Sequence, residues 1–322
     1  MRKVKALYLH WPPAHRYWRD ALFEAIGSRH ALTEYDPETP LQAQLSDIEV
    51  LLDHGGRCAT GEIIAAASHL RLWQMITVGY DTVDLDITAD RDIMISNCPG
   101  STSARGLAET AMMFMLTLVK QYRRAQCLVA RGELSTLLTD ELEHKRLAII
   151  GFGASGSCLA RLAAAFGMRL LIVEPREISA RELEGLSPDV VAKPDDLDSV
   201  LAEADFVSLH LPLGPETAGI IDSRRIGLMK PTARLINVAR AGLVNEEALN
   251  QALIEGQIAG IGSDVFADRL PGRESAAFEH KDLVALPHVA GGSEGTIRRR
   301  SEVCLENLDR IAQGLEPKHR VR

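Results

Sequence analysis

Three glycines and one glutamate have the spacing of a dinucleotide-binding site. Gly151, Gly153 and Gly156 form the pattern G-x-G-x-x-G, and Glu174 lies 18 residues after the last of them. The first glycine permits a tight turn, the second lets the backbone approach a pyrophosphate, and the third lets a helix pack closely on a strand. A carboxylate at Glu174 would accept hydrogen bonds from ribose hydroxyls and repel a 2′-phosphate. The spacing therefore predicts NAD rather than NADP, although Arg176 works against that preference.

A strand, a helix and a second strand are predicted to position these residues. Leu147 to Ile150 is a short apolar run, a helical pattern closed by Gly167 follows the glycines, and Leu170 to Val173 is a second apolar run. The N-terminus of such a helix offers unpaired N–H groups and partial positive charge to phosphates. The candidate cofactor-binding loop comprises Gly151, Phe152, Gly153, Ala154, Ser155 and Gly156.

The rest of the chain alternates short apolar runs with helical patterns in two series, which predicts two parallel sheets with helices on both faces. Strands are expected at 4–9, 50–52, 72–77 and 93–96, and then near 147–150, 170–173, 190–192, 206–209, 233–237, 258–263 and 283–285. Residues 103–127 read as one long helix, 131–145 as a surface linker and 293–314 as a final helix. Ligands bind at the carboxyl ends of parallel strands, which makes the loops at 54–56 and 78–80 candidates for ligand binding.

Composition excludes several classes of protein. The 322 residues carry a net charge of −8 and include five scattered cysteines. Without a long basic block or an 18-residue apolar segment, neither nucleic acid nor a membrane is expected as a partner. The cysteines lack metal-site spacing, so we expect reduced thiols, a cytoplasmic protein and no metal.

Six ordered segments resemble the D-isomer-specific 2-hydroxyacid dehydrogenase family. They are IIGFGASG, LAAAFGMRLLIVEP, ADFVSLHLPLGPETAGIID, LMKPTARLINVARAGLVNEEAL, GIGSDVF and LPHVAGGS, and the first half adds VGYDTVDL and ISNCPG…LAET. The resemblance implies an NAD-binding Rossmann domain, residues 99–290, inserted into a flavodoxin-like substrate domain, residues 1–98 and 291–322. It further implies an active site in the cleft between these domains, and a homodimer with the helix after ISNCPG at the interface.

The resemblance also assigns roles to individual residues. Arg240, in NVARAG, matches the active-site arginine, whose guanidinium would anchor the substrate carboxylate and polarise the carbonyl. His288, in LPHVAGG, matches the general acid/base, since imidazole titrates near neutral pH. Val78 and Gly79, with further amides from Gly55 and Gly56, match the loops that bind the substrate carboxylate. Four more positions are expected beside the nucleotide, namely His210, Pro212, Ala239 and Asp264, with His210 expected to pack rather than react.

One departure from the family pattern concerns the tuning of His288. The family places a glutamate five residues after the position of Asp264, and this sequence has Arg269 there. A carboxylate would favour the imidazolium and raise its pKa, whereas an arginine would lower it. Either Asp268 or Glu274 supplies the carboxylate, Asp268 being preferred because it is adjacent, or His288 works alone.

Smaller departures lie near the expected cleft. Ala241 stands where a second glycine is common, and one extra residue lies between Asn97 and Glu109. Arg57 or Arg105 could meet a second anionic group on the substrate, although a surface charge is the favoured interpretation of both.

The leading hypothesis is an NAD-dependent enzyme that interconverts a small 2-oxo acid and its D-2-hydroxy acid, for example a glyoxylate or hydroxypyruvate reductase. Two alternatives remain open. The first is an enzyme of the same fold acting on phosphoglycerate, phosphite or formate. The second is a non-catalytic NAD-sensing protein, which the arginine at position 269 would permit.

Overall fold

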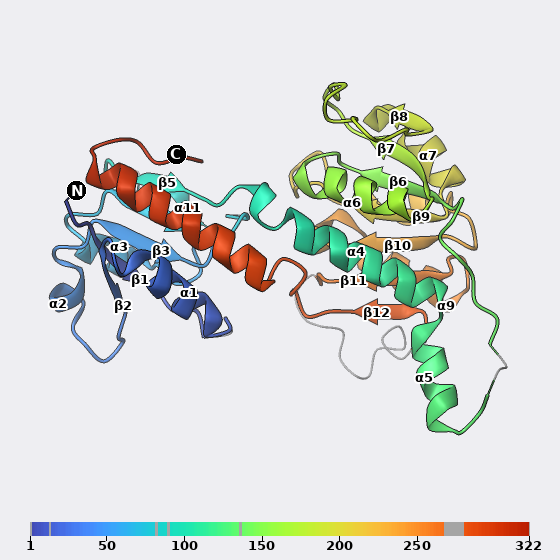
Figure 1. The fold of residues 1–322 in the computed structure, drawn as a ribbon, viewed down its shortest axis with the longest axis horizontal. Helices are drawn as coiled ribbons and strands as arrows, with labels where there is room; N and C mark the ends of the chain where they lie inside the picture. Colours follow the sequence, from blue (N-terminus) through green and yellow to red (C-terminus); the bar gives the residue numbers. More distant parts are fainter. Residues whose placement is uncertain are drawn as a thin grey trace. The chain divides into compact units, whose positions relative to one another are not determined.

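The structure, a computed structural model, describes residues 2–12, 14–80, 83–88, 91–134, 137–266 and 280–321. The chain divides into two compact units (Figure 1), of which unit 1 is Met1–Thr102 with Ser293–Arg322 and unit 2 is Ser103–Gly292. Each unit is built on one parallel sheet with helices on its faces, which confirms the predicted α/β class. Among the described residues, no helix is long and apolar enough to cross a membrane.

Unit 1 has a five-stranded sheet in the order β2-β1-β3-β4-β5, the order of flavodoxin-like sheets. The strands are β1 (Lys5–Tyr8), β2 (Ala31–Glu34), β3 (Val50–Asp53), β4 (Leu72–Met75) and β5 (Met94–Ser96). The helices are α1 (Tyr17–Ile26), α2 (Leu41–Leu45), α3 (Gly61–Ala66) and α11 (Glu294–Ala312), with short 3-10 turns η1 (Leu85–Thr88) and η2 (Gly100–Thr102). Helix α11 packs against α1 on one face, so the C-terminal helix belongs to this unit although it follows unit 2 in sequence.

Unit 2 has a seven-stranded sheet in the order β12-β11-β10-β9-β6-β7-β8, which contains the Rossmann strand order. The strands are β6 (Arg146–Ile150), β7 (Arg169–Val173), β8 (Val190–Ala192), β9 (Phe206–Leu209), β10 (Arg234–Asn237), β11 (Gly260–Ser263) and β12 (Leu283–Ala285). The helices are α4 (Ala104–Val119), α5 (Tyr122–Ala130), α6 (Ala154–Ala165), α7 (Leu197–Glu203), α8 (Ser223–Ile226) and α9 (Glu246–Ile254), with turns η3 (Pro194–Asp196) and η4 (Ala241–Leu243).

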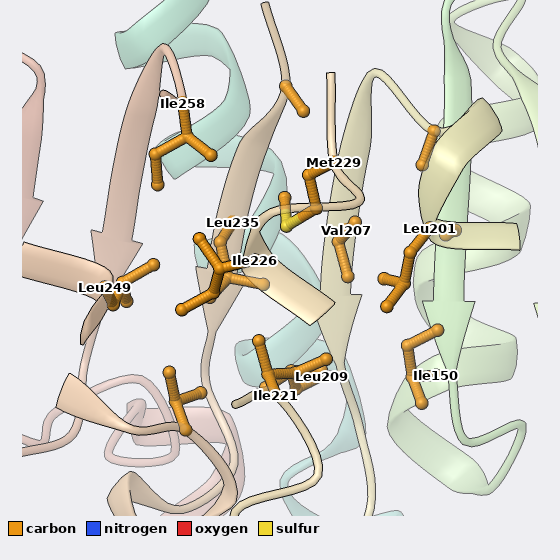
Figure 2. Close-up of a cluster of buried hydrophobic side chains, with 14 of the residues drawn as sticks. Ile150, Leu201, Val207, Leu209, Ile221, Ile226, Met229, Leu235, Leu249 and Ile258 are labelled. Carbon is orange, nitrogen blue, oxygen red and sulfur yellow. The ribbon is translucent and has the colours of Figure 1, made fainter. Parts of the chain in front are cut away.

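Alternation along the central strand β6 divides the core of unit 2 into two layers. Leu147 and Ile149 face the layer that includes α4 and α6, whereas Ala148 and Ile150 face the layer beneath α7, α8 and α9. Figure 2 shows the second layer, in which Ile150, Val207 and Leu209 of the sheet meet Leu201, Ile226 and Leu249 of the helices. Packing on both faces explains why the strands read as continuous apolar runs.

The prediction of one helix over 103–127 is wrong, because α4 ends at Val119 and α5 begins at Tyr122. Gln121 between them has a left-handed backbone, with φ 48°. The segment that follows α5 returns to this point: the Gln121 side chain donates to the carbonyl of Leu138 at 2.7 Å, and the N–H of Asp140 donates to the carbonyl of Val119 at 3.2 Å. These tertiary hydrogen bonds provide partners for backbone and side-chain groups at the end of α4. The periodicity of the sequence alone does not predict them.

Candidate active site

Six neighbouring strands of unit 2 each end just before a predicted site residue. The order β12-β11-β10-β9-β6-β7 is parallel throughout, so the carboxyl ends of these strands lie along one edge of the sheet. The residues that follow them there are His288, Asp264, Arg240, His210, Gly151 and Glu174. The topology therefore places residues that are up to 137 positions apart in the sequence along one edge of the sheet. Open α/β sheets bind ligands at this edge.

The glycine loop has the geometry that its three glycines predict. Gly151 has φ 95°, and a Cβ on Gly156 would lie 2.0 Å from the carbonyl oxygen of Gly151, so neither position has room for a side chain. By contrast, no atom lies within 4 Å of a Cβ built on Gly153, which is exposed together with Ala154. The backbone is thus open where a pyrophosphate would approach, and the first-turn N–H groups of α6 have no partner within the helix. These features fit the phosphates of NAD.

Glu174 is buried and bonded to the glycine loop. Its Oε2 accepts a hydrogen bond from the N–H of Phe152 at 2.6 Å, and its Oε1 faces the guanidinium of Arg176, with 3.4 Å to Nε. Arg176 in turn donates to the carbonyl of Phe152 at 2.8 Å. Hydrogen bonds therefore link Glu174 and Arg176 to the glycine loop at the end of β7.

His210 lies beneath the glycine loop. One ring nitrogen is 2.9 Å from the hydroxyl of Ser208 and the other is 3.0 Å from the hydroxyl of Ser155. Burial lowers the pKa of His210 to about 4, so the ring is neutral at physiological pH and can both donate and accept. Its place supports the packing role, because the ring links the loop to the end of β9. Pro212, two residues on, is exposed, and its carbonyl accepts from the hydroxyl of Thr217 at 2.7 Å.

Arg240 lies on a loop that Asn237 fixes. The side chain of Asn237 donates to the carbonyl of Arg240 at 2.9 Å and accepts from the N–H of Ala239 at 3.0 Å. Arg240 is partly exposed, and its guanidinium donates to the carbonyl of Ala239 at 2.9 Å. Asn237 was not singled out from the sequence. Its position as the last residue of β10, directly before the arginine motif, is the signal that could have identified it.

His288 is exposed and has a left-handed backbone, with φ 59°. The buried carboxylate of Asp264 bonds the two residues that follow it, since Oδ1 accepts from the N–H of Val289 at 2.8 Å and Oδ2 from the N–H of Ala290 at 2.9 Å. Burial raises the pKa of Asp264 to about 6, and the two N–H groups counter that effect. Asp264 therefore positions the histidine loop through its backbone.

In unit 1, the loops after β3 and β4 pack against each other at the carboxyl edge of the sheet. Gly55 has φ 70°, and a Cβ there would lie 2.8 Å from the hydroxyl oxygen of Thr77 and 3.1 Å from the carbonyl oxygen of Gly79. Asn97 donates to the carbonyl of Val78 at 2.7 Å, and Thr77 donates to the carbonyl of Gly79 at 2.8 Å. The carbonyls of Val78 and Gly79 are thus satisfied by the protein. Their N–H groups donate to no acceptor in the described part of the chain, as a carboxylate-binding loop requires.

The side chain of His54 is buried in the interior of unit 1. Its Nε2 lies 2.8 Å from the hydroxyl of Tyr8, with Trp11 and Trp18 around the ring, and burial lowers its pKa to about 3. Next to this loop, Arg57 is exposed and lies over the ring of Trp11, 4.9 Å from its centre. Arg105 is exposed on α4.

The residues expected to tune His288 by charge, namely Asp268, Arg269 and Glu274, lie outside the described residues, and their roles stay predictions. Within the described part of the chain, no group of three or more histidines, cysteines and acids is placed to bind a metal.

Comparison with known proteins identifies the family. The sequence profile described as D-isomer specific 2-hydroxyacid dehydrogenase, NAD binding domain, matches residues 112–290. A glyoxylate reductase of Thermococcus litoralis is 31% identical over 296 residues, 88% of this chain and 87% of that protein. A D-3-phosphoglycerate dehydrogenase of Methanocaldococcus jannaschii is 30% identical over 295 residues, but the aligned part is only 55% of that protein.

Among solved structures, the D-lactate dehydrogenase of Aquifex aeolicus, complexed with NAD and lactic acid, superposes with a TM-score of 0.77 at 26% identity over 96% of both chains. The profile match and this structure confirm NAD as the predicted cofactor. The profile matches more than half of the chain, and the glycine loop and the strand order of both units agree with it. The chain therefore belongs to the D-isomer-specific 2-hydroxyacid dehydrogenases, a family of oxidoreductases.

Proposed function

We propose that the chain is an NAD(H)-dependent oxidoreductase that interconverts a small 2-oxo acid and its D-2-hydroxy acid. The observation that carries this proposal is the common sheet edge of unit 2, where the glycine loop, Arg240 and the loop of His288 follow three parallel strands of one sheet, β6, β10 and β12. When bound, reduced nicotinamide supplies the hydride for the carbonyl carbon.

Arg240 would bind the substrate and polarise its carbonyl. Arg240 is partly exposed, and its guanidinium has planar donors that match two oxygens at once. The Asn237 bonds to Ala239 and to the carbonyl of Arg240 fix the backbone from which the side chain extends. A fixed backbone reduces the entropy lost on binding the substrate. In unit 1, the N–H groups of Val78 and Gly79 would bind the substrate carboxylate, with Gly55 and Gly56 adding further amides.

His288 would act as the general acid in reduction, donating a proton to the forming alkoxide, and as the general base in oxidation. Because the residue is exposed, it can exchange the proton with water between turnovers. Asp264 holds the loop through Val289 and Ala290. Asp268 is proposed as the carboxylate that favours the imidazolium, on sequence position alone.

Glyoxylate and hydroxypyruvate are the first substrates to test, because a glyoxylate reductase aligns over most of both chains. The assay is the loss of NADH absorbance with glyoxylate, hydroxypyruvate, pyruvate, phenylpyruvate and the phosphorylated 2-oxo acid that corresponds to 3-phosphoglycerate. We expect turnover of at least one small 2-oxo acid. Arg240→Gln is the matched control, since it should bind NADH normally and lose turnover. NADH binding without turnover of any 2-oxo acid, and without reduction of NAD by phosphite or formate, would instead support a nucleotide sensor.

We also propose that the chain is a homodimer that pairs through α4, α5 and α6. Met113 of α4 and Phe166 after α6 are 40% and 46% exposed and line one apolar groove. Helix α5 buries none of its residues and exposes Tyr122 and Val129. Large exposed apolar surface of this kind is typical of subunit interfaces.

A further inference from the structure

Arg176 makes contacts that bear on the choice between NAD and NADP. Its guanidinium Nη2 donates to the carbonyl of Phe152 and also lies 2.8 Å from Oε1 of Glu182, while its Nε is 3.4 Å from Glu174. The side chain of Arg176 is 46% exposed, so its position depends on these partners rather than on burial. An arginine here was the one feature of the sequence that favoured NADP.

The carboxylate of Glu182 is itself held by reciprocal hydrogen bonds with Ser179. Oε2 of Glu182 accepts from the N–H of Ser179 at 3.0 Å and from its hydroxyl at 2.8 Å, while the N–H of Glu182 donates to that hydroxyl at 3.3 Å. This is the arrangement of a capping box. The bond from Arg176, together with those from Ser179, lowers the pKa of Glu182 to about 2, so it is ionised at any pH of interest. Because Oε2 is used by Ser179, Oε1 remains directed at Arg176.

We propose that Glu182 is a positioning residue for nucleotide selectivity, which holds Arg176 against the glycine loop and compensates its charge so that NADP is disfavoured. This inference rests on the proposed function, because it concerns the adenosine ribose of the same cofactor.

The physical reason is a balance of charges at the end of β7. A 2′-phosphate carries nearly two negative charges and needs cationic donors to replace its water. Arg176, the cation that pairs with Glu174, already has two carboxylates and two carbonyls as partners. To bind the phosphate, Arg176 would have to leave Glu182, and the phosphate would then face two carboxylates, those of Glu174 and Glu182. A ribose that carries a free 2′-hydroxyl has no such cost.

The test measures the dissociation constants of NADH and NADPH by fluorescence titration of the full chain. Glu182→Gln keeps the shape of the side chain and removes its charge, and we expect NADPH to bind about fivefold more tightly while NADH changes less than twofold. Glu184→Gln is the matched control: it removes an exposed carboxylate two residues away that forms no ion pair with the described residues, and it should change the ratio of the two constants less than twofold.

The double variant Arg176→Gln with Glu182→Gln separates position from charge. If Glu182 acts through Arg176, the double variant should lose the gain in NADPH affinity that Glu182→Gln provides. The inference is overturned if Glu182→Gln leaves the ratio unchanged, or if the double variant retains the gain, since the carboxylate would then act without the arginine. A wild-type chain that binds neither nucleotide refutes the proposed function, and this inference with it. Tight NADH binding with an unchanged ratio refutes this inference alone.

Discussion

Two glycines of the loop are expected to respond differently when one methyl group is added to each. Gly156→Ala places a Cβ 2.0 Å from the carbonyl oxygen of Gly151 and 3.2 Å from the side chain of Ile149. Gly153→Ala places the same methyl where no atom lies within 4 Å, on a residue with φ −75° that alanine adopts freely. The first variant tests helix-to-strand packing, and the second tests the approach of the pyrophosphate.

The magnitudes follow from these distances. At Gly156 the methyl overlaps a backbone oxygen by more than 1 Å relative to the 3.4 Å of an ordinary contact, and neither partner can rotate away. Overpacking costs about 1–3 kcal/mol, and a contact between backbone atoms belongs at the upper end, so we expect a loss of about 3 kcal/mol and a melting temperature lower by roughly 10 °C. Gly153→Ala should cost less than about 1 kcal/mol, because it changes only the N-cap of α6.

For nucleotide binding the order of the two variants should reverse, with the larger effect expected for Gly153→Ala. Hydrogen bonds to a charged phosphate contribute about 1.5–3 kcal/mol each, so the loss of one at Gly153 should weaken NADH binding about 10- to 100-fold while the fold persists. Thermal unfolding followed by circular dichroism and fluorescence titration with NADH measure the two quantities. A Gly156→Ala protein with wild-type stability would refute the packing argument. A Gly153→Ala protein with wild-type NADH affinity would refute the assignment of the pyrophosphate to this loop.

Four further predictions concern the reaction and the assembly. Arg240→Lys should lower kcat/KM for the 2-oxo acid at least 100-fold, because an ammonium lacks the planar donors, with the Kd of NADH unchanged in titration. Asp264→Asn should lower kcat by misplacing the loop of His288. Because burial raises the pKa of Asp264 to about 6 in the folded chain, its contribution to stability is fully present below pH 4 and falls by about 3 kcal/mol as the pH rises to 7. Urea unfolding at both pH values should show that the asparagine variant lacks this difference. Asp268→Asn should extend the acidic limb of the oxidation pH profile to lower pH, and an unchanged profile and rate would exclude Asp268. Met113→Asp should convert a dimer into a monomer in light scattering, with NADH affinity retained.

Local pattern predicted much of the fold because burial on both faces forces the strands to be apolar. The runs at 147–150 and 170–173 became β6 and β7 at almost those bounds. Strand β2 was not predicted because it lacks this burial. It is an edge strand, and Ala31–Glu34 alternates exposed and intermediate residues without an apolar run. The break at Gln121 depends on a contact with residues 138–140, so its cause lies outside any window that periodicity examines.

Site residues could be predicted where the local backbone requires one residue type. They could not be predicted where their role depends on a hydrogen-bond partner from another part of the chain. Glycine at 151 and 156 is dictated by a turn and a close contact that lie within the loop itself, so spacing was sufficient. The partners of Glu174, Asp264 and His54 are backbone groups or side chains from other elements, and only the packed structure brings them together. The sequence showed the carboxylate of Glu174 next to Arg176, but not that Glu182 lies on the other side of the arginine.

The backbone around His288 provides a physical account of how the imidazole is oriented that does not depend on the residue at position 269. A non-glycine residue with positive φ is strained by about 1 kcal/mol or more and persists where its surroundings determine the backbone. His288 has φ 59°, and the carboxylate of Asp264 bonds the two N–H groups that follow it. Removal of one acceptor should let this segment relax towards negative φ and turn the imidazole away from its working direction. The orientation of the histidine is then set by a carboxylate bonded to the backbone of the two residues that follow it, and a second carboxylate is needed only to adjust the pH at which the imidazole gains a proton.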